Sequence, residues 1–231
     1  MKGIRILAVD TSSQVCGVAL CEGERLVAQS SLNVRSPHSR TLLEQLDLLL
    51  RRSGWQPADL DLLAVVTGPG AFTGLRIGLG TVKGLAQVLS LPVVSITSLQ
   101  AVAINLALTM EPVCVLLDAR KQEVYTQVFD CRGPVPVSLN RARVLPPAQL
   151  LAELDEPVVL LGDGASAYAD LITQKAGSQV RLAPACAHVV SPVRVAWLGF
   201  RKYLQGDAQQ AENILPFYIR PADAEPSKGR A

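Results

Sequence analysis

The chain has 231 residues, of which 49% are hydrophobic and 18% charged, so it can bury one large core or two modest ones. Its 22 basic and 20 acidic residues are interspersed and give a net charge of +2, without the basic stripe of a dedicated nucleic-acid binder. No apolar run reaches the roughly 18 residues that cross a bilayer, and no signal-peptide pattern precedes the first predicted strand. We expect a globular protein without a membrane partner, and any contact with nucleic acid should be shared with a partner.

The five cysteines, Cys16, Cys21, Cys114, Cys131 and Cys186, form no Cys-x-x-Cys pair. Most of them fall in apolar strand patterns, where a free cysteine behaves as a small buried hydrophobic residue. This usage predicts a reduced, cytoplasmic protein.

The first 108 residues predict a meander of three strands followed by strand–helix units, because β-branched and apolar runs alternate with amphipathic stretches. The predicted strands cover residues 4–9, 16–20, 25–31, 62–66 and 92–96, and the predicted helices cover residues 38–53, 75–89 and 98–108. We interpret this part as the first lobe, residues 1–108.

The pattern restarts at Val113, with a strand, a polar turn and a second strand, and an Asp again closes the first strand. This weak internal duplication predicts a second, related lobe over residues 109–231. Its further predicted elements are a loop over 133–147, a strand over 158–161, helices over 148–154, 167–176 and 192–205, an extended segment over 214–220 and a frayed tail over 222–231. The helix after Pro192 has the position to pack back on the first lobe.

Asp10 ends the first predicted strand and is followed by hydroxyl side chains in a turn, a pattern that can hold a hydrated metal ion and phosphate oxygens. An aspartate that only caps a turn is a commoner explanation. The turn over residues 11–14 lacks the glycine that phosphate-binding turns use for close backbone approach, which argues against nucleotide binding here.

The glycine-rich loop over residues 68–74 leads into a helix amino terminus, which favours an anion, but it lacks the Gly-Lys-Ser/Thr of a Walker A loop. At the predicted helix, two pairs of glycines are spaced by four residues, Gly74 with Gly78 and Gly80 with Gly84. The two pairs lie on separate faces of the helix. Two neighbours can therefore approach this helix closely. One would be the sheet, and the other is either a helix of a partner subunit or an intramolecular neighbour.

Side chains that carry catalysis are scarce. The only histidines are His38 and His188, and neither has a second ligand three or four residues away. We expect no metal site built by the protein, no Ser-His-Asp triad and no catalytic residue.

Several motifs carry a family resemblance that covers nearly the whole chain. Residues 6–12 (ILAVDTS) with 18–20 (VAL) resemble the first hairpin of the actin, sugar-kinase and heat-shock-protein superfamily. Residues 67–78 (TGPGAFTGLRIG) and 83–86 (KGLA) resemble the signature of the TsaB (YeaZ) family, and 118–120 (DAR), 123–125 (EVY) and 218–220 (YIR) also match it. The resemblance implies two actin-like, ribonuclease H-like α/β lobes, each a mixed β-sheet flanked by helices.

The related catalytic family, TsaD, carries a metal-binding His-x-x-x-His motif, whose histidines would fall at Ser98 and Val102 of this sequence. Neither residue can replace a histidine ligand. The resemblance therefore implies a non-catalytic accessory subunit that supports a TsaD-type subunit and a TsaE-type ATPase in transferring threonylcarbamoyl to the tRNA adenosine beside the anticodon. It implies contact with tRNA through the complex, and pairing into a homodimer when the chain is alone.

The resemblance also assigns residues to two sites. A vestigial nucleotide cleft, with weak affinity for ATP or ADP with magnesium, would comprise Asp10, Thr11, Ser12, Gly68, Gly70, Thr73 and Asp118. A partner interface on the helices of the first lobe would comprise His38, Leu42, Gln45, Leu48, Leu75, Arg76, Leu79 and Lys83. Two alternatives stay open: an active ATP-dependent kinase, in which Asp10 and Asp118 bind magnesium-phosphate, and a metallopeptidase, which the absent histidine pair disfavours.

Overall fold

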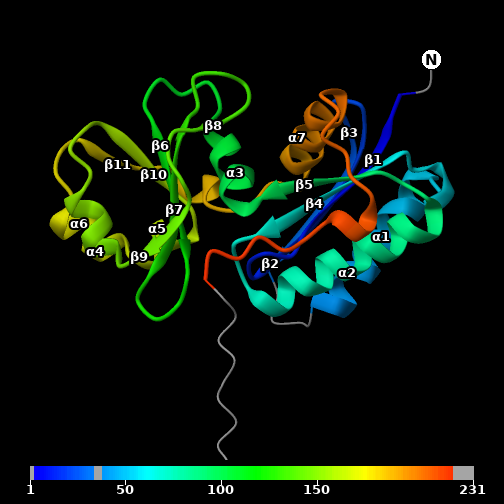
Figure 1. The fold of residues 1–231 in the computed structure, drawn as a ribbon, viewed down its shortest axis with the longest axis horizontal. Helices are drawn as coiled ribbons and strands as arrows, with labels where there is room; N and C mark the ends of the chain where they lie inside the picture. Colours follow the sequence, from blue (N-terminus) through cyan, green and yellow to red (C-terminus); the bar gives the residue numbers. More distant parts are fainter. Residues whose placement is uncertain (1–2, 34–37, 221–231) are drawn as a thin grey trace, which may run out of the picture.

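The computed structural model describes residues 3–33 and 38–220. They form two lobes that lie side by side, each built on one β-sheet (Figure 1). The tail predicted over residues 222–231 lies outside the described residues. Among the described helices, none is long and apolar enough to cross a membrane.

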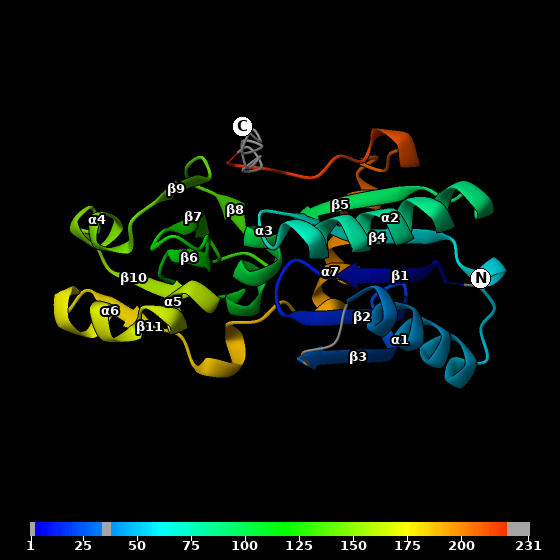
Figure 2. The ribbon, with the colours of Figure 1, turned by 90° about the horizontal axis from the view of Figure 1, so that it is seen from below.

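The first sheet has the strand order β3-β2-β1-β4-β5, with two antiparallel pairings at the β3 side and two parallel pairings at the β5 side. Its strands are β1 (Arg5–Asp10), β2 (Val15–Glu22), β3 (Arg25–Asn33), β4 (Leu62–Gly68) and β5 (Val93–Thr97). Its helices are α1 (His38–Ser53), α2 (Phe72–Leu89) and α7 (Pro192–Leu204), with short 3-10 turns η1 (Pro57–Asp59) and η4 (Ala211–Asn213). Figure 2 shows α1 and α2 on one side of this sheet.

Both faces of the first sheet are buried because alternate side chains of β1 point in opposite directions. Leu7 and Val9 pack in a core shared with α1 and α2. Ile6 and Ala8 pack in a second core, to which α7, the helix α3 (Ser98–Ala103) and the second sheet all contribute. The second core therefore joins the two lobes.

The second sheet has the order β11-β10-β6-β7-β8, and β9 also pairs with β7. Its strands are β6 (Val113–Asp118), β7 (Val124–Asp130), β8 (Val137–Ser138), β9 (Arg143–Leu145), β10 (Val158–Leu161) and β11 (Val180–Leu182). The other elements of this half are α4 (Pro147–Ala152), α5 (Asp163–Ala167), α6 (Ala169–Lys175), η2 (Ile104–Leu106) and η3 (Ala185–Ala187). Its leading hairpin, β6–β7, repeats the antiparallel β1–β2 hairpin, and Asp118 ends β6 as Asp10 ends β1.

The structure differs from the predicted elements in several places. The helix predicted to begin at residue 75 begins at Phe72, and the helix predicted over 98–108 ends at Ala103 and continues as a 3-10 turn. The helix predicted over 167–176 is two short helices, and the predicted loop over 133–147 contains β8 and β9. Strands of two or three residues are too short to show an alternating pattern, so β8, β9 and β11 were not predicted.

Candidate functional site

Asp10 lies at the end of β1 and is almost fully buried, with 1% of its surface exposed. Its Oδ1 accepts a hydrogen bond of 2.9 Å from the backbone N–H of Ser12, the geometry of a turn cap. Its Oδ2 is buried without a hydrogen-bond partner among the described residues. Burial penalises the charged form and raises the pKa of Asp10 to about 6.

The turn after β1 packs directly on the glycine-rich loop and the first turns of α2. The Thr11 hydroxyl donates to the carbonyl of Gly74 at 2.7 Å, and the Ala71 N–H donates to the carbonyl of Ser12 at 2.7 Å. A Cβ atom on Gly70 or Gly74 would lie 2.2 Å from a carbonyl oxygen of this turn. The glycines therefore make room for the chain's own turn, which occupies the space in front of the loop.

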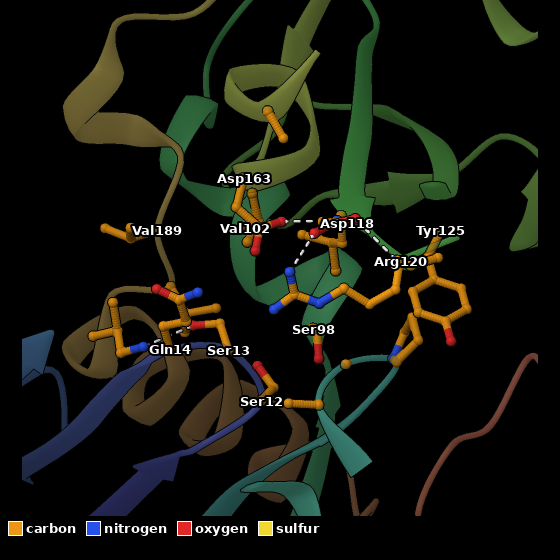
Figure 3. Close-up of a pocket in the computed structure, with 18 of the residues that line it drawn as sticks. Ser12, Ser13, Gln14, Ser98, Val102, Asp118, Arg120, Tyr125, Asp163 and Val189 are labelled. Carbon is orange, nitrogen blue, oxygen red and sulfur yellow. Dashed lines mark hydrogen bonds and ion pairs between the residues drawn. The ribbon is translucent and has the colours of Figure 1, made fainter. Parts of the chain in front are cut away.

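A cleft of about 810 Å³ separates the two lobes next to this turn. Figure 3 shows Ser12 and Ser13 on one side of it, opposite Asp118, Arg120 and Asp163. The remaining polar and aromatic lining includes Gln14, Ser98, Tyr125, His188, Tyr218 and Arg220.

The second-lobe wall of the cleft is held by hydrogen bonds within the wall. The Asp118 N–H donates to Oδ1 of Asp163 at 3.0 Å, and burial raises the pKa of Asp163. The Asp118 carboxylate accepts the Arg120 N–H at 2.9 Å and pairs with its guanidinium at 3.1 Å. Three successive residues of this turn, Arg120, Lys121 and Gln122, have positive φ angles of 59°, 52° and 60°, a strained arrangement for side chains other than glycine.

Ser98 and Val102, where the catalytic family would carry histidines, both line the cleft from α3. The Ser98 hydroxyl is buried and has no hydrogen-bond partner among the described residues. No group of three or more His, Cys, Asp or Glu side chains in the described part of the chain is arranged to hold a metal ion.

The two histidines are both engaged by the backbone. His38 Nε2 donates to the carbonyl of Ser13 at 2.9 Å, which ties the start of α1 to the β1–β2 turn. His188 Nδ1 accepts the Gly162 N–H at 3.1 Å, and burial lowers the pKa of this imidazole. Among the described residues, neither histidine is hydrogen-bonded to a nucleophilic side chain.

The predicted cleft residues are not all part of the lining. Ser12, Gly70 and Asp118 line the cleft, whereas Asp10 and Thr11 lie buried behind it. Gly68 and Thr73 are not part of the lining. Gly68 has a φ of +118° and lies against the backbone of Phe217, and Thr73 is exposed on α2.

Four of the predicted interface residues were assigned wrongly. Leu42, Leu75 and Leu79 are buried in the core of the first lobe, at 0%, 0% and 5% exposed, and cannot meet a partner. Gln45 is also buried, and its Nε2 donates to the carbonyl of Cys16. Lys83 is engaged by the C-terminal segment, because its Nζ donates to the carbonyl of Ile214 at 2.9 Å.

The remaining predicted interface residues are accessible. Leu48 is 51% exposed, Arg76 is exposed and His38 is half-buried. Leu43, which stands outside the predicted interface because its spacing groups it with the core leucines, is 56% exposed on α1. The sequence does not predict this exposure, because Leu43 stands three residues before Leu46 and seven before Leu50, which are both buried.

Three residues of the site were not among the predicted site residues. Asp163 follows β10 in a Gly-Asp-Gly turn, a strand-end signal of the same kind as that of Asp10. Arg120 stands two residues after a strand-ending aspartate, where an ion pair was not predictable from spacing alone. His188 has no recognisable sequence signal, because only the fold brings it to Gly162.

Known proteins resemble this chain over most of its length. The sequence model of the TsaD family, described as tRNA N6-adenosine threonylcarbamoyltransferase, matches residues 33–227. The tRNA threonylcarbamoyladenosine biosynthesis protein TsaB of Bacillus subtilis is 30% identical over 223 residues, which cover 95% of this chain and 96% of that protein. This chain belongs to the TsaB family. The TsaB protein of Haemophilus influenzae is 32% identical, with 95% of each chain covered.

Solved structures agree with the membership in the TsaB family. YeaZ from Pseudomonas aeruginosa superposes with a TM-score of 0.81 at 28% identity, covering 93% of this chain and 99% of that chain. Component A of the (R)-2-hydroxyglutaryl-CoA dehydratase of Acidaminococcus fermentans shares the fold alone, with a TM-score of 0.51 at 11% identity, covering 87% of this chain and 99% of that chain. The predicted actin-like α/β fold and the predicted family are both confirmed.

Proposed function

We propose that this chain is the non-catalytic accessory subunit of a complex that forms threonylcarbamoyladenosine in tRNA, where it supports a TsaD-type transferase together with a TsaE-type ATPase. The observation that carries the proposal is the pair Ser98 and Val102, which line the cleft where the resemblance puts the metal-binding histidines of TsaD. A hydroxyl and an isopropyl group cannot supply imidazole ligands. The role of the chain is then assembly rather than chemistry.

The internal contacts of the cleft support this role. The Thr11 hydroxyl and the Ser12 carbonyl are bonded to the glycine-rich loop, and the Asp118 carboxylate is neutralised by Arg120. Groups that hold their own chain in place are less available to magnesium-phosphate. Any affinity for ATP or ADP is expected to be weak.

The exposed face of α1 and α2 is the proposed docking surface for the TsaD-type subunit. Leu43 and Leu48 are 56% and 51% exposed on α1. They stand about 140° apart around the helix, at the two edges of its otherwise polar exposed side. Gly80 and Gly84 on α2 have no atom within 4 Å of a Cβ position, so a partner helix can approach this face closely. The same face would allow a homodimer when the TsaD-type subunit is absent.

A matched pair of leucines tests the docking surface. Leu43→Glu should weaken binding of the TsaD-type subunit about tenfold or more, because it puts a charge into an apolar contact. Leu139→Glu is the control, since Leu139 is also 56% exposed but lies in the second lobe. Calorimetric titration of both variants measures the difference, and equal binding by both variants would reject this surface.

The proposed function is tested by leaving this chain out of the reaction mixture. Threonylcarbamoyl-adenosine is measured on unmodified tRNA with the TsaD-type subunit, the TsaE-type ATPase and the adenylate-forming enzyme, with and without this chain. The proposal expects product only in the complete mixture. Product without this chain, or turnover by this chain alone with ATP, would contradict it, and the latter would favour a kinase.

A further inference from the structure

Exposed aromatic side chains gather at one place on this protein. The chain has four Phe, four Tyr and two Trp residues. Only Phe72, Phe217 and Tyr218 are exposed, at 37%, 39% and 37%, and the other aromatic side chains are buried or half-buried. These three lie where the start of α2 meets the segment over residues 214–220. With the neighbouring cations they form what we call the basic–aromatic patch: Phe72, Arg76, Lys83, Phe217, Tyr218 and Arg220.

The C-terminal part of the patch is fixed to the first lobe. Ile214 is 1% exposed and packs in the core beneath α1 and α2. The Phe217 N–H donates to the carbonyl of Thr67 at 2.8 Å, and Lys83 Nζ donates to the carbonyl of Ile214 at 2.9 Å. Figure 1 shows this red segment running from the first lobe toward the space between the lobes. The aromatic side chains are therefore presented by an ordered backbone, which lowers the entropy cost of binding.

The aromatic rings of the patch already form a stack. The Phe72 and Tyr218 ring centroids are 5.5 Å apart with an interplanar angle of 30°, and the Arg76 guanidinium lies 3.8 Å from the Phe72 centroid. Phe72 and Tyr218 also line the cleft, so the stack stands at its edge. A planar nucleobase can extend such a stack, because every base has a π-face that packs on aromatic and guanidinium groups.

The charged side chains on α2 and on the segment over residues 214–220 are all basic. Helix α2 carries Arg76 and Lys83 and no acidic residue, and the segment over residues 214–220 carries only Arg220. Neither Arg76 nor Lys83 has a carboxylate partner among the described residues, whereas Arg220 pairs with Glu123. Positive charge beside a stacking surface complements a base and its phosphate. This combination favours single-stranded nucleic acid over an apolar protein surface as the occupant.

We propose that the basic–aromatic patch binds an unpaired RNA nucleotide, with the base stacked on Tyr218 and the neighbouring phosphate beside Arg76. This inference rests on the proposed function and deepens it, because it gives the accessory subunit a direct contact with the RNA substrate. Arg220 is paired with Glu123 and Lys83 donates to the carbonyl of Ile214, so the patch supplies few phosphate contacts and the chain alone binds weakly. The contact adds to the affinity of the assembled complex through effective concentration.

Fluorescence anisotropy of the full chain with a fluorescein-labelled single-stranded oligoadenylate at low salt tests the proposal. Tyr218→Leu keeps an apolar side chain but removes the ring, and should weaken binding about tenfold. Arg76→Gln should lower the slope of log affinity against log salt by roughly 1. Leu215→Ala, 70% exposed in the same segment, and Arg52→Gln, exposed at the end of α1, are the controls and should bind like the parent chain.

Two results would overturn the proposal: no binding of the oligoadenylate by the parent chain, or equal weakening by the controls. A Tyr218→Leu variant that binds RNA normally but loses the TsaD-type subunit would make the patch a protein interface instead. Thermal unfolding of each variant checks that it is folded. The omission experiment does not depend on these readouts, so either proposal can fail while the other stands.

Discussion

At the scale of single residues, Asp10 is the most perturbed group of the site. It is buried at the end of β1 with one unpartnered oxygen, and burial raises its pKa to about 6 from a model-peptide value of 3.8. The folded state therefore binds the proton more tightly than the unfolded state does, and this group lowers stability as the pH rises from about 4 to 6. Above about pH 6 the buried Asp10 is charged, and its full destabilising contribution to folding is present.

Asp10→Asn removes the charge and keeps the oxygen that accepts the Ser12 N–H. We expect the variant to be about 1–2 kcal/mol more stable at pH 8, with a flatter pH dependence between pH 4 and 6. Urea unfolding at a series of pH values measures both effects. Asp130→Asn is the control, because the ion pair with Arg132 lowers the pKa of Asp130 to about 2 and this group titrates outside the window. Unchanged stability of Asp10→Asn at pH 8 would contradict the assignment.

At the scale of elements, helix α2 has two glycine rows with opposite roles. Gly74 faces the turn after β1, where a Cβ atom would lie 2.2 Å from the Thr11 carbonyl oxygen. Gly84 has no atom within 4 Å of a Cβ position. Gly74→Ala should destabilise the chain by about 1–3 kcal/mol through overpacking, and Gly84→Ala should stabilise it by about 0.5–1 kcal/mol through helix propensity. Chemical denaturation compares the two, and equal effects would contradict this account of the helix.

The sequence predicted the elements that have a long, clear period. The sequence correctly predicts the leading hairpins, the glycine-rich loop and the strand-ending Asp10 and Asp118. The predicted partner interface includes residues that the structure buries, because the helices of the first lobe were assigned to it as a whole. Spacing by four residues puts Leu42 with the buried Leu46, but Leu43 also stands three residues before Leu46 and seven before the buried Leu50. Helical spacing alone therefore does not predict that Leu43 is exposed.

At the scale of the whole molecule, helix α7 follows the second sheet in the chain but packs on the first. Its Val195, Ala196 and Leu198 are buried in the core that joins the lobes, and a Cβ atom on Gly199 would lie 2.6 Å from the Cβ of Ala64. The cleft likewise combines residues from Ser12 to Arg220, so its lining could not be predicted from local sequence patterns. The lobe boundary at residue 108 stays a prediction.

This packing predicts how fragments behave. A fragment over residues 1–108 would expose the sheet face that α7 covers, and we expect it not to unfold cooperatively. Adding a second fragment over residues 192–220, which supplies α7 and Ile214, should restore near-ultraviolet circular dichroism and a cooperative transition. Cooperative unfolding of the 1–108 fragment alone would show that the first lobe is independent.

The central claim is that assembly, not cleft chemistry, is the contribution of this chain. The most direct measurement is threonylcarbamoyl-adenosine formation in the complete mixture with two variants, a cleft variant (Asp10→Asn with Asp118→Asn) and the docking variant Leu43→Glu. We predict nearly normal product with the cleft variant and about tenfold less with the docking variant at limiting concentration. Loss of product with a folded cleft variant that still binds the TsaD-type subunit would contradict the account and make these carboxylates functional.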